Sequence, residues 1–215
     1  MNYLNLTDKG QRLVDMYAEM AKNGYLTNYG ADIKDAYNSF ELRKIRDEIK
    51  KKFTQYNVQT VLDYGCGGSD WNAPGFENER SATDFFDLKK VYSYEPARDI
   101  DERALVDCVV CFDVLEHIFV SDVATVLRDI FSCANRLVIL NVACYEANAL
   151  LPNGENAHIT VRNPHWWKGV LDLISVEFPS VSIDLLCSPQ YNKMLAFQTF
   201  SDEQRQADDK FCIAY

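Results

Sequence analysis

The chain has 215 residues, 47% of them hydrophobic, with 12 Tyr, 12 Phe and 3 Trp and a formal net charge of −10. This length and aromatic content predict one folded domain over residues 1–215 and exclude a disordered chain. The negative charge argues against a nucleic-acid partner, because phosphate binding rests on Lys and Arg, although a local basic patch would still permit it.

The first thirty residues are polar and mixed in charge, without the apolar core of a signal peptide. No run approaches the roughly 18 apolar residues of a membrane span. The sequence has seven cysteines, and two of them, Cys108 and Cys111, form a C-x-x-C pattern inside an apolar strand-like run. Side chains three apart on a strand point to opposite faces, so we expect buried, reduced cysteines and a cytoplasmic protein without membrane contact.

Two helical patterns open the chain, at residues 8–22 and 40–53, where apolar side chains recur at helical spacing. We expect residues 1–56 to form a helical cap. The segment between the two helices, residues 24–38, contains three tyrosines and two glycines. It is interpreted either as a lid that closes over a site or as an ordinary connection whose tyrosines pack on the core.

From residue 57 onward, short apolar runs alternate with helical patterns. The first strand ends at residues 61–62, and the others are predicted at 91–95, 106–112, 137–142, 181–187 and 194–200. Helices are predicted at 81–89, 121–134 and 166–174, the last with Asn163 as N-cap and Pro164 in its first turn. This alternation predicts an α/β fold with a doubly wound, mostly parallel sheet. The last two strands have no helix between them and should form an antiparallel pair.

The segment Val61-Leu62-Asp63-Tyr64-Gly65-Cys66-Gly67-Gly68-Ser69 joins the end of a buried strand to a glycine turn. Glycine permits a sharp turn and a close approach of a ligand to the backbone, and Asp63 lies at the carboxyl edge that ligands use in open α/β sheets. A dinucleotide-binding turn needs a third glycine where this chain has Asp70, whose charge would repel a pyrophosphate.

This segment resembles motif I of the class I S-adenosylmethionine-dependent methyltransferases. The resemblance implies S-adenosyl-L-methionine as cofactor, methyl transfer as the reaction, and a Rossmann-like, seven-stranded methyltransferase core over residues 57–215. An acid at the end of the second strand binds the ribose hydroxyls in this family, and that role passes to Glu95. The implied cofactor contacts are Asp63, Gly65, Cys66, Gly67, Glu95, Asp113 and Leu115.

A second segment, Cys111-Phe112-Asp113-Val114-Leu115-Glu116-His117-Ile118, resembles the D/E-V-L-E-H segment of ubiquinone-biosynthesis-type methyltransferases. Related small-RNA terminal methyltransferases bind a divalent metal through two acids and two histidines. The matching residues here are Asp113, Glu116, His117 and His158. Mixed carboxylate and imidazole ligands suit Mn²⁺, Fe²⁺ or Zn²⁺ better than Mg²⁺.

A metal-free interpretation is also open, in which Glu116 and His117 line the cofactor pocket and His158 acts as a general base. The candidate catalytic residues are therefore His158, His117 and Asp113. We expect O-methylation of a small hydroxylated metabolite or sugar. The alternatives are a methyltransferase-like protein that binds the cofactor without turnover and an RNA methyltransferase, which would need a basic surface beside the pocket.

Overall fold

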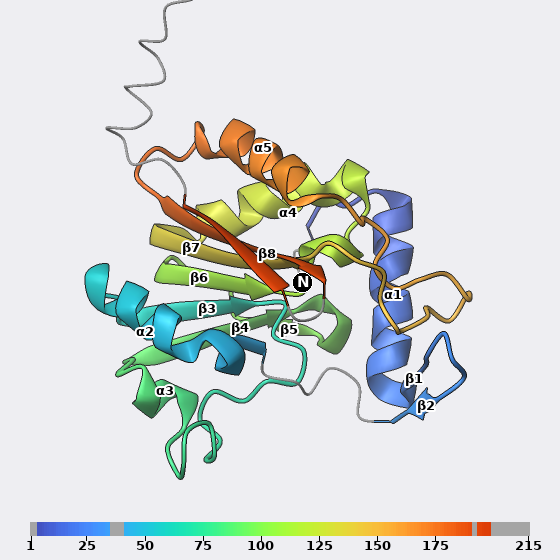
Figure 1. Cartoon of the computed structure of the whole chain (residues 1–215), viewed down its shortest axis with the longest axis horizontal. Coiled ribbons are helices and arrows are strands. Elements are labelled where there is room, and N and C mark those ends of the chain that lie inside the picture. Colours follow the sequence, from blue (N-terminus) through green and yellow to red (C-terminus); the bar gives the residue numbers. More distant parts are fainter. Residues whose placement is uncertain (1–3, 35–40, 191–192, 199–215) are drawn as a thin grey trace, which may run out of the picture.

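The computed structural model of the protein describes residues 4–34, 41–190 and 193–198. Seven of its strands form one sheet: β3 (Thr60–Tyr64), β4 (Lys90–Glu95), β5 (Ile100–Asp101), β6 (Val106–Phe112), β7 (Ala134–Ala143), β8 (Ser182–Gln190) and β9 (Lys193–Gln198). Their order in the sheet is β5-β4-β3-β6-β7-β8-β9 (Figure 1). The five central strands are parallel, whereas β5 and β9 run antiparallel to their neighbours at the two edges. The predicted seven-stranded, mostly parallel α/β sheet with an antiparallel C-terminal pair is confirmed. Residues 199–200 of the last predicted strand lie outside the described residues.

Strands β3, β6 and β7 are almost wholly buried, as their mainly apolar sequences predict. In β6, Val109 and Cys111 face one core cluster, whereas Cys108 and Val110 face the other. The two cysteines of the C-x-x-C pattern therefore point to opposite sides of the sheet, as expected from the strand period of two.

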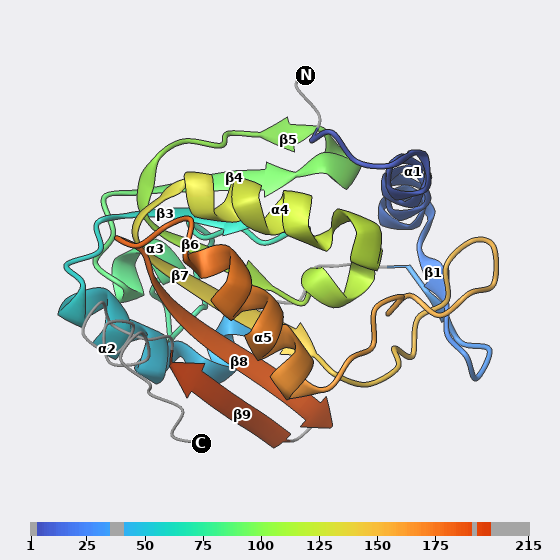
Figure 2. The same ribbon diagram turned by 90° about the horizontal axis from the view of Figure 1, so that it is seen from above.

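Helices cover both faces of this sheet (Figure 2). On one face lie α4 (Val120–Ser132) and α5 (Pro164–Ser175), and on the other lie α2 (Arg46–Gln55) and the short α3 (Ala82–Phe85). The N-cap prediction for α5 is confirmed: the side chain of Asn163 accepts a hydrogen bond from the amide of Trp166, and Pro164 opens the helix. The predicted helix at 40–53 begins with a 3₁₀ turn, η1 (Glu41–Ile45), before α2.

The first helix, α1 (Asp8–Asn23), stands beyond the carboxyl ends of the parallel strands, apart from the helices that cover the sheet (Figures 1 and 2). It packs against η2 (Pro96–Arg98), the 3₁₀ turn that follows β4, and against the loop after β7. The two N-terminal helices thus differ in position, since α2 packs on a sheet face and α1 on the carboxyl edge.

Between them, the segment predicted as a loop contains a small antiparallel hairpin of β1 (Tyr25–Leu26) and β2 (Asp32–Ile33). The hairpin pairs with the loop after β7. Thr27 forms an antiparallel β-bridge with Ala149, and the amide of Leu150 donates a hydrogen bond to the carbonyl of Leu26. The interpretation of residues 24–38 as a lid stays a prediction, and residues 35–38 lie outside the described residues. None of the described helices combines the length and the apolar character needed to cross a membrane.

Candidate functional site

The turn after β3 is built around Gly65, which has a φ of +80°. Its amide and that of Cys66 donate to the carbonyl of Tyr94 in β4, at 2.7 and 3.1 Å. A Cβ atom at Gly65 would lie 2.3 Å from Cγ2 of Val114. Glycine is therefore required at this position twice, by the backbone conformation and by the close side chain.

Glu95 ends β4 and is tied to the same turn. Its Oε2 accepts a hydrogen bond from the amide of Gly67 at 3.0 Å, and its Oε1 accepts one from Ala97 at 3.0 Å. Burial raises the pKa of Glu95, and the two backbone hydrogen bonds oppose that shift. Each carboxylate oxygen has a second acceptor position, so Glu95 can still bind two hydroxyl groups.

A first cavity, of about 150 Å³, lies between α1 and the carboxyl ends of β3, β4 and β6. Leu13, Val14 and Tyr17 line it from α1. The predicted site residues that line it from the sheet edge are Gly65, Gly67, Glu95, Asp113 and His117.

Asp63 is buried beneath the turn, and the indole Nε1 of Trp71 donates to its Oδ2 at 2.8 Å. Burial raises the pKa of Asp63 to about 7; the Trp71 hydrogen bond lowers it, and the charge of Glu95 raises it further. Trp71 belongs to the stretch 70–80 that follows the turn, and its ring is buried against the sheet. The ionisation of the Asp63 carboxyl group is therefore sensitive to its surroundings near neutral pH.

A second cavity, of about 350 Å³, adjoins the first and shares Gly65, Gly67, Asp113 and His117 with it. Its volume lies in the range of small-molecule sites. The other predicted site residues that line it are Asp63, Cys66 and His158. Leu115, by contrast, is fully buried in the core and lines neither cavity. Burial raises the pKa of the Cys66 thiol to about 12, so Cys66 stays protonated.

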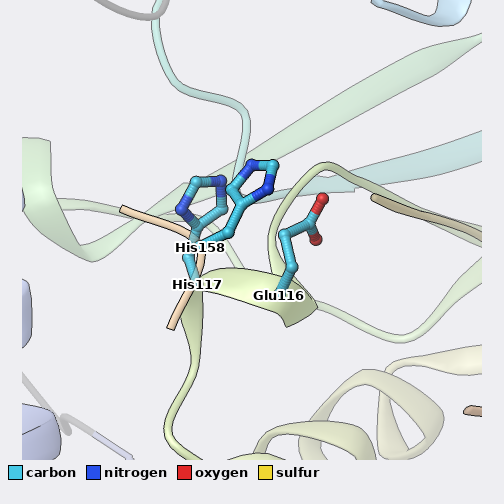
Figure 3. Close-up of side chains that lie close together, drawn as sticks. All are labelled: Glu116, His117 and His158. Carbon is cyan, nitrogen blue, oxygen red and sulfur yellow. The ribbon is translucent and has the colours of Figure 1, made fainter. Parts of the chain in front are cut away.

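Three of the four predicted metal ligands come together beside the second cavity. Glu116 and His117 lie in η3 (Leu115–His117), and His158 approaches them from the loop after β7 (Figure 3). One potential ligand atom from each residue lies within 4.8 Å of the others. We call Glu116, His117 and His158 the triad.

The backbone fixes the proton position on both histidines of the triad. Nδ1 of His117 lies 2.9 Å from the carbonyl oxygen of Ala157, and Nδ1 of His158 lies 2.5 Å from that of Tyr145. A carbonyl oxygen only accepts, so each Nδ1 carries the proton and each Nε2 keeps its lone pair. Burial lowers the pKa of His117 to about 3 and also lowers the pKa of His158, so both rings are neutral at neutral pH.

Glu116 is fully buried. Its Oε1 accepts a hydrogen bond from the amide of Ala143 at 2.7 Å, while Oε2 has no hydrogen-bond partner among the described residues. Burial raises the pKa of Glu116 well above its ordinary value. A buried oxygen without a partner costs free energy, and two nitrogen lone pairs lie nearby. This donor set fits a divalent cation, and its histidines have the backbone support that metal-bound histidines need.

The fourth predicted ligand, Asp113, does not group with these three residues. Its backbone adopts a left-handed conformation, with φ of +53°, and its Oδ1 accepts a hydrogen bond from Nδ2 of Asn141 at 3.2 Å. Asp113 consequently lines both cavities but is not part of the triad.

Tyr17 is a site residue that sequence reasoning missed. Its hydroxyl lies 2.6 Å from Nδ1 of His117 and donates to the carbonyl of Ala157 at 2.9 Å. The helical pattern placed Tyr17 on the apolar face of α1, but nothing in that pattern indicates a partner one hundred residues later in the chain.

The chain matches no protein-family model and no curated protein.

Proposed function

We propose that the protein is an S-adenosyl-L-methionine-dependent methyltransferase with a Rossmann-like fold that methylates an oxygen of a small hydroxylated metabolite or sugar. One observation carries the proposal: the glycine turn after β3 is hydrogen bonded to Glu95 at the end of the adjacent parallel strand β4. The glycine turn and an acid that could bind ribose hydroxyls therefore lie at one edge of the sheet, where open α/β sheets bind ligands.

The first cavity suits the adenosine part of the cofactor. Its wall from α1 is largely apolar, and Glu95 at its rim would accept hydrogen bonds from the two ribose hydroxyls. Gly65 and Gly67, which line both cavities, would allow the cofactor to pass close to the backbone. The cationic end of the cofactor would then lie near Asp63, and a neighbouring positive charge favours the ionised form of that carboxyl.

The second cavity suits the methyl acceptor. When bound, the cofactor supplies an electrophilic methyl group, whose bond to sulfur breaks as the bond to the acceptor oxygen forms. Most of the catalytic effect would come from aligning that oxygen with the methyl carbon. Without a metal, the Nε2 lone pair of His158 would accept the hydroxyl proton, while His117 and Asp113 orient the acceptor.

The triad supports a metal-assisted form of the same reaction. Glu116, His117 and His158 would hold Mn²⁺, Fe²⁺ or Zn²⁺, since Mg²⁺ prefers a shell of oxygen ligands. A bound divalent ion lowers the pKa of an acceptor hydroxyl and orients it. The Oε2 atom of Glu116 favours this form, because without a metal that buried oxygen has no hydrogen-bond partner within the described part of the chain.

Calorimetric titration of S-adenosylhomocysteine tests the cofactor site. We expect micromolar binding to the wild type and binding about tenfold weaker in Glu95→Gln, because a hydrogen bond to a charged group is lost. Glu79→Gln is the matched control, since Glu79 is exposed. The absence of binding to the wild type would refute the proposal.

A turnover assay then separates catalysis from binding alone. Release of S-adenosylhomocysteine is measured with sugars, hydroxylated metabolites and RNA oligonucleotides, with and without Mn²⁺. Turnover with a small hydroxylated acceptor, lost in His158→Ala, supports the proposal, whereas binding without any turnover would favour a cofactor-binding protein. The six cysteines within the described ranges are free thiols, which agrees with the cytoplasmic location that we propose for this enzyme.

A further inference from the structure

We propose that Tyr17 is a positioning residue that couples ligand binding in the first cavity to metal binding at the triad. This inference rests on the proposed function and adds a role for α1. Tyr17 belongs to both regions: its side chain lines the first cavity, and its hydroxyl contacts Nδ1 of His117, a member of the triad.

The Tyr17 hydroxyl takes part in a set of three mutual contacts. The Tyr17 oxygen, Nδ1 of His117 and the carbonyl oxygen of Ala157 form a triangle with sides of 2.6, 2.9 and 2.9 Å. The Tyr17 hydroxyl donates to Ala157, so the proton on Nδ1 of His117 is shared between the Tyr17 oxygen and the same carbonyl. Tyr17 therefore helps to keep Nε2 of His117 unprotonated and its ring in a fixed orientation.

The position of Tyr17 depends on how α1 packs against the rest of the protein. The start of the helix is held by Asp122, which accepts two hydrogen bonds from Thr7, and Leu13 packs against the loop that carries His158. Leu13, Val14 and Tyr17 form one wall of the first cavity. A ligand in that cavity would press on the face of α1 that carries Tyr17, and so restrict the ring that orients His117.

Coupling between two binding sites is a free energy, and it is reciprocal. A ligand that fixes α1 should strengthen metal binding at the triad, and a metal at the triad should strengthen cofactor binding by the same factor. The Tyr17 hydroxyl is the direct hydrogen-bonded connection between them, so its removal should uncouple the two sites while the aromatic ring keeps α1 packed.

The test is a thermodynamic cycle on the full-length protein. Mn²⁺ is titrated calorimetrically with and without saturating S-adenosylhomocysteine, in the wild type, Tyr17→Phe and Tyr29→Phe. Tyr29 is 69% exposed, which makes its variant the matched control. We expect S-adenosylhomocysteine to tighten Mn²⁺ binding about fivefold or more in the wild type and in Tyr29→Phe. In Tyr17→Phe, Mn²⁺ alone should bind about tenfold more weakly, and the effect of S-adenosylhomocysteine should fall below about twofold. Coupling that is absent from the wild type, or equal in Tyr17→Phe, overturns the proposal.

Nitrogen-15 spectra of the histidine rings provide a readout that does not need either ligand. The wild type should show the Nδ1-protonated form of His117, with a strongly hydrogen-bonded proton, and Tyr17→Phe should shift that signal while the His158 signals stay in place. If Mn²⁺ fails to bind the wild type, the metal site of the proposed function is wrong. The His117 spectrum then still decides whether Tyr17 positions the ring, and an unchanged spectrum in Tyr17→Phe would reject that role. A thermal melt of Tyr17→Phe close to the wild type shows that the fold is intact.

Discussion

The carboxylate of Asp122 accepts two hydrogen bonds from Thr7, one from its backbone amide at 2.8 Å and one from its hydroxyl at 2.7 Å. Asp122 lies in the first turn of α4 and is 2% exposed, while Thr7 is the N-cap of α1. This contact joins two helices that are more than one hundred residues apart, and it holds α1 over the first cavity.

Removal of the Thr7 hydroxyl should loosen that attachment. Thr7→Ala loses the helix cap and leaves the buried carboxylate with one partner fewer, so we expect a loss of about 2 kcal/mol in the free energy of unfolding. Thr7→Ser keeps both hydrogen bonds and should stay within about 0.5 kcal/mol of the wild type. Urea denaturation measures both, and equal losses in the two variants would show that the methyl group, not the hydroxyl, matters.

The Oε2 atom of Glu116 leads to one prediction for stability without metal and another for stabilisation by metal. Glu116→Gln replaces a fully buried carboxyl group that has one hydrogen-bond partner, the Ala143 amide, among the described residues. The metal-free variant should therefore be at least as stable as the wild type, while Mn²⁺ or Zn²⁺ should no longer raise its melting temperature. Thermal melts with and without metal test this, and Glu146→Gln is the control because Glu146 is exposed. A variant that is still stabilised by metal would remove Glu116 from the ligand set.

Alanine variants of Gly65 and Gly154 distinguish the effect of backbone strain from that of steric overlap. Both have a positive φ, +80° and +85°, but only at Gly65 would a Cβ meet another atom, 2.3 Å away on Val114, whereas nothing described lies within 4 Å at Gly154. Gly154→Ala should cost about 1 kcal/mol and leave S-adenosylhomocysteine binding intact. Gly65→Ala should cost about 3 kcal/mol or more and weaken that binding.

The double variant Gly65→Ala with Val114→Ala supplies the second half of this comparison. It relieves the overlap but not the strain, so it should recover part of the binding seen by calorimetry. If Gly65→Ala and Gly154→Ala behave alike, the close approach of Val114 has no effect on the turn.

The sheet could be predicted because its inner strands β3, β6 and β7 are buried. The apolar runs 108–112 in β6 and 137–140 in β7 indicate a covered parallel sheet whatever surrounds them. The two-residue strands β1, β2 and β5 were not predicted, since two residues carry no periodicity and their pairing depends on a neighbouring chain segment.

Some features of the candidate site could likewise be predicted from the sequence, and others could not. Gly65, Glu95 and the Glu116–His117 pair follow strand ends, so their positions could be inferred from the order of the elements. The left-handed conformation that directs Asp113 toward Asn141 has no local sequence signal. The contact of Tyr17 with His117 depends on how α1 packs, which a sequence pattern does not determine.

Asp63 predicts an unusual dependence of stability on pH. Its pKa is raised from 3.8 to about 7 in the folded protein, chiefly by burial. Between these two values the folded protein binds more protons than the unfolded chain, so this residue makes the protein less stable as pH rises. The effect is complete above about pH 7, where the buried carboxyl is ionised in both states, and it amounts to about 4 kcal/mol.

Asp63→Asn should abolish that contribution while its amide oxygen can still accept the hydrogen bond from Trp71. The free energy of unfolding of the variant, relative to the wild type, should therefore increase from pH 4.5 to about pH 7 and then level off toward pH 8. Urea denaturation at several pH values measures this difference, with the exposed Asp70→Asn as control. Parallel pH profiles for wild type and Asp63→Asn would mean that Asp63 is ionised throughout this range, with a charge stabilised inside the fold.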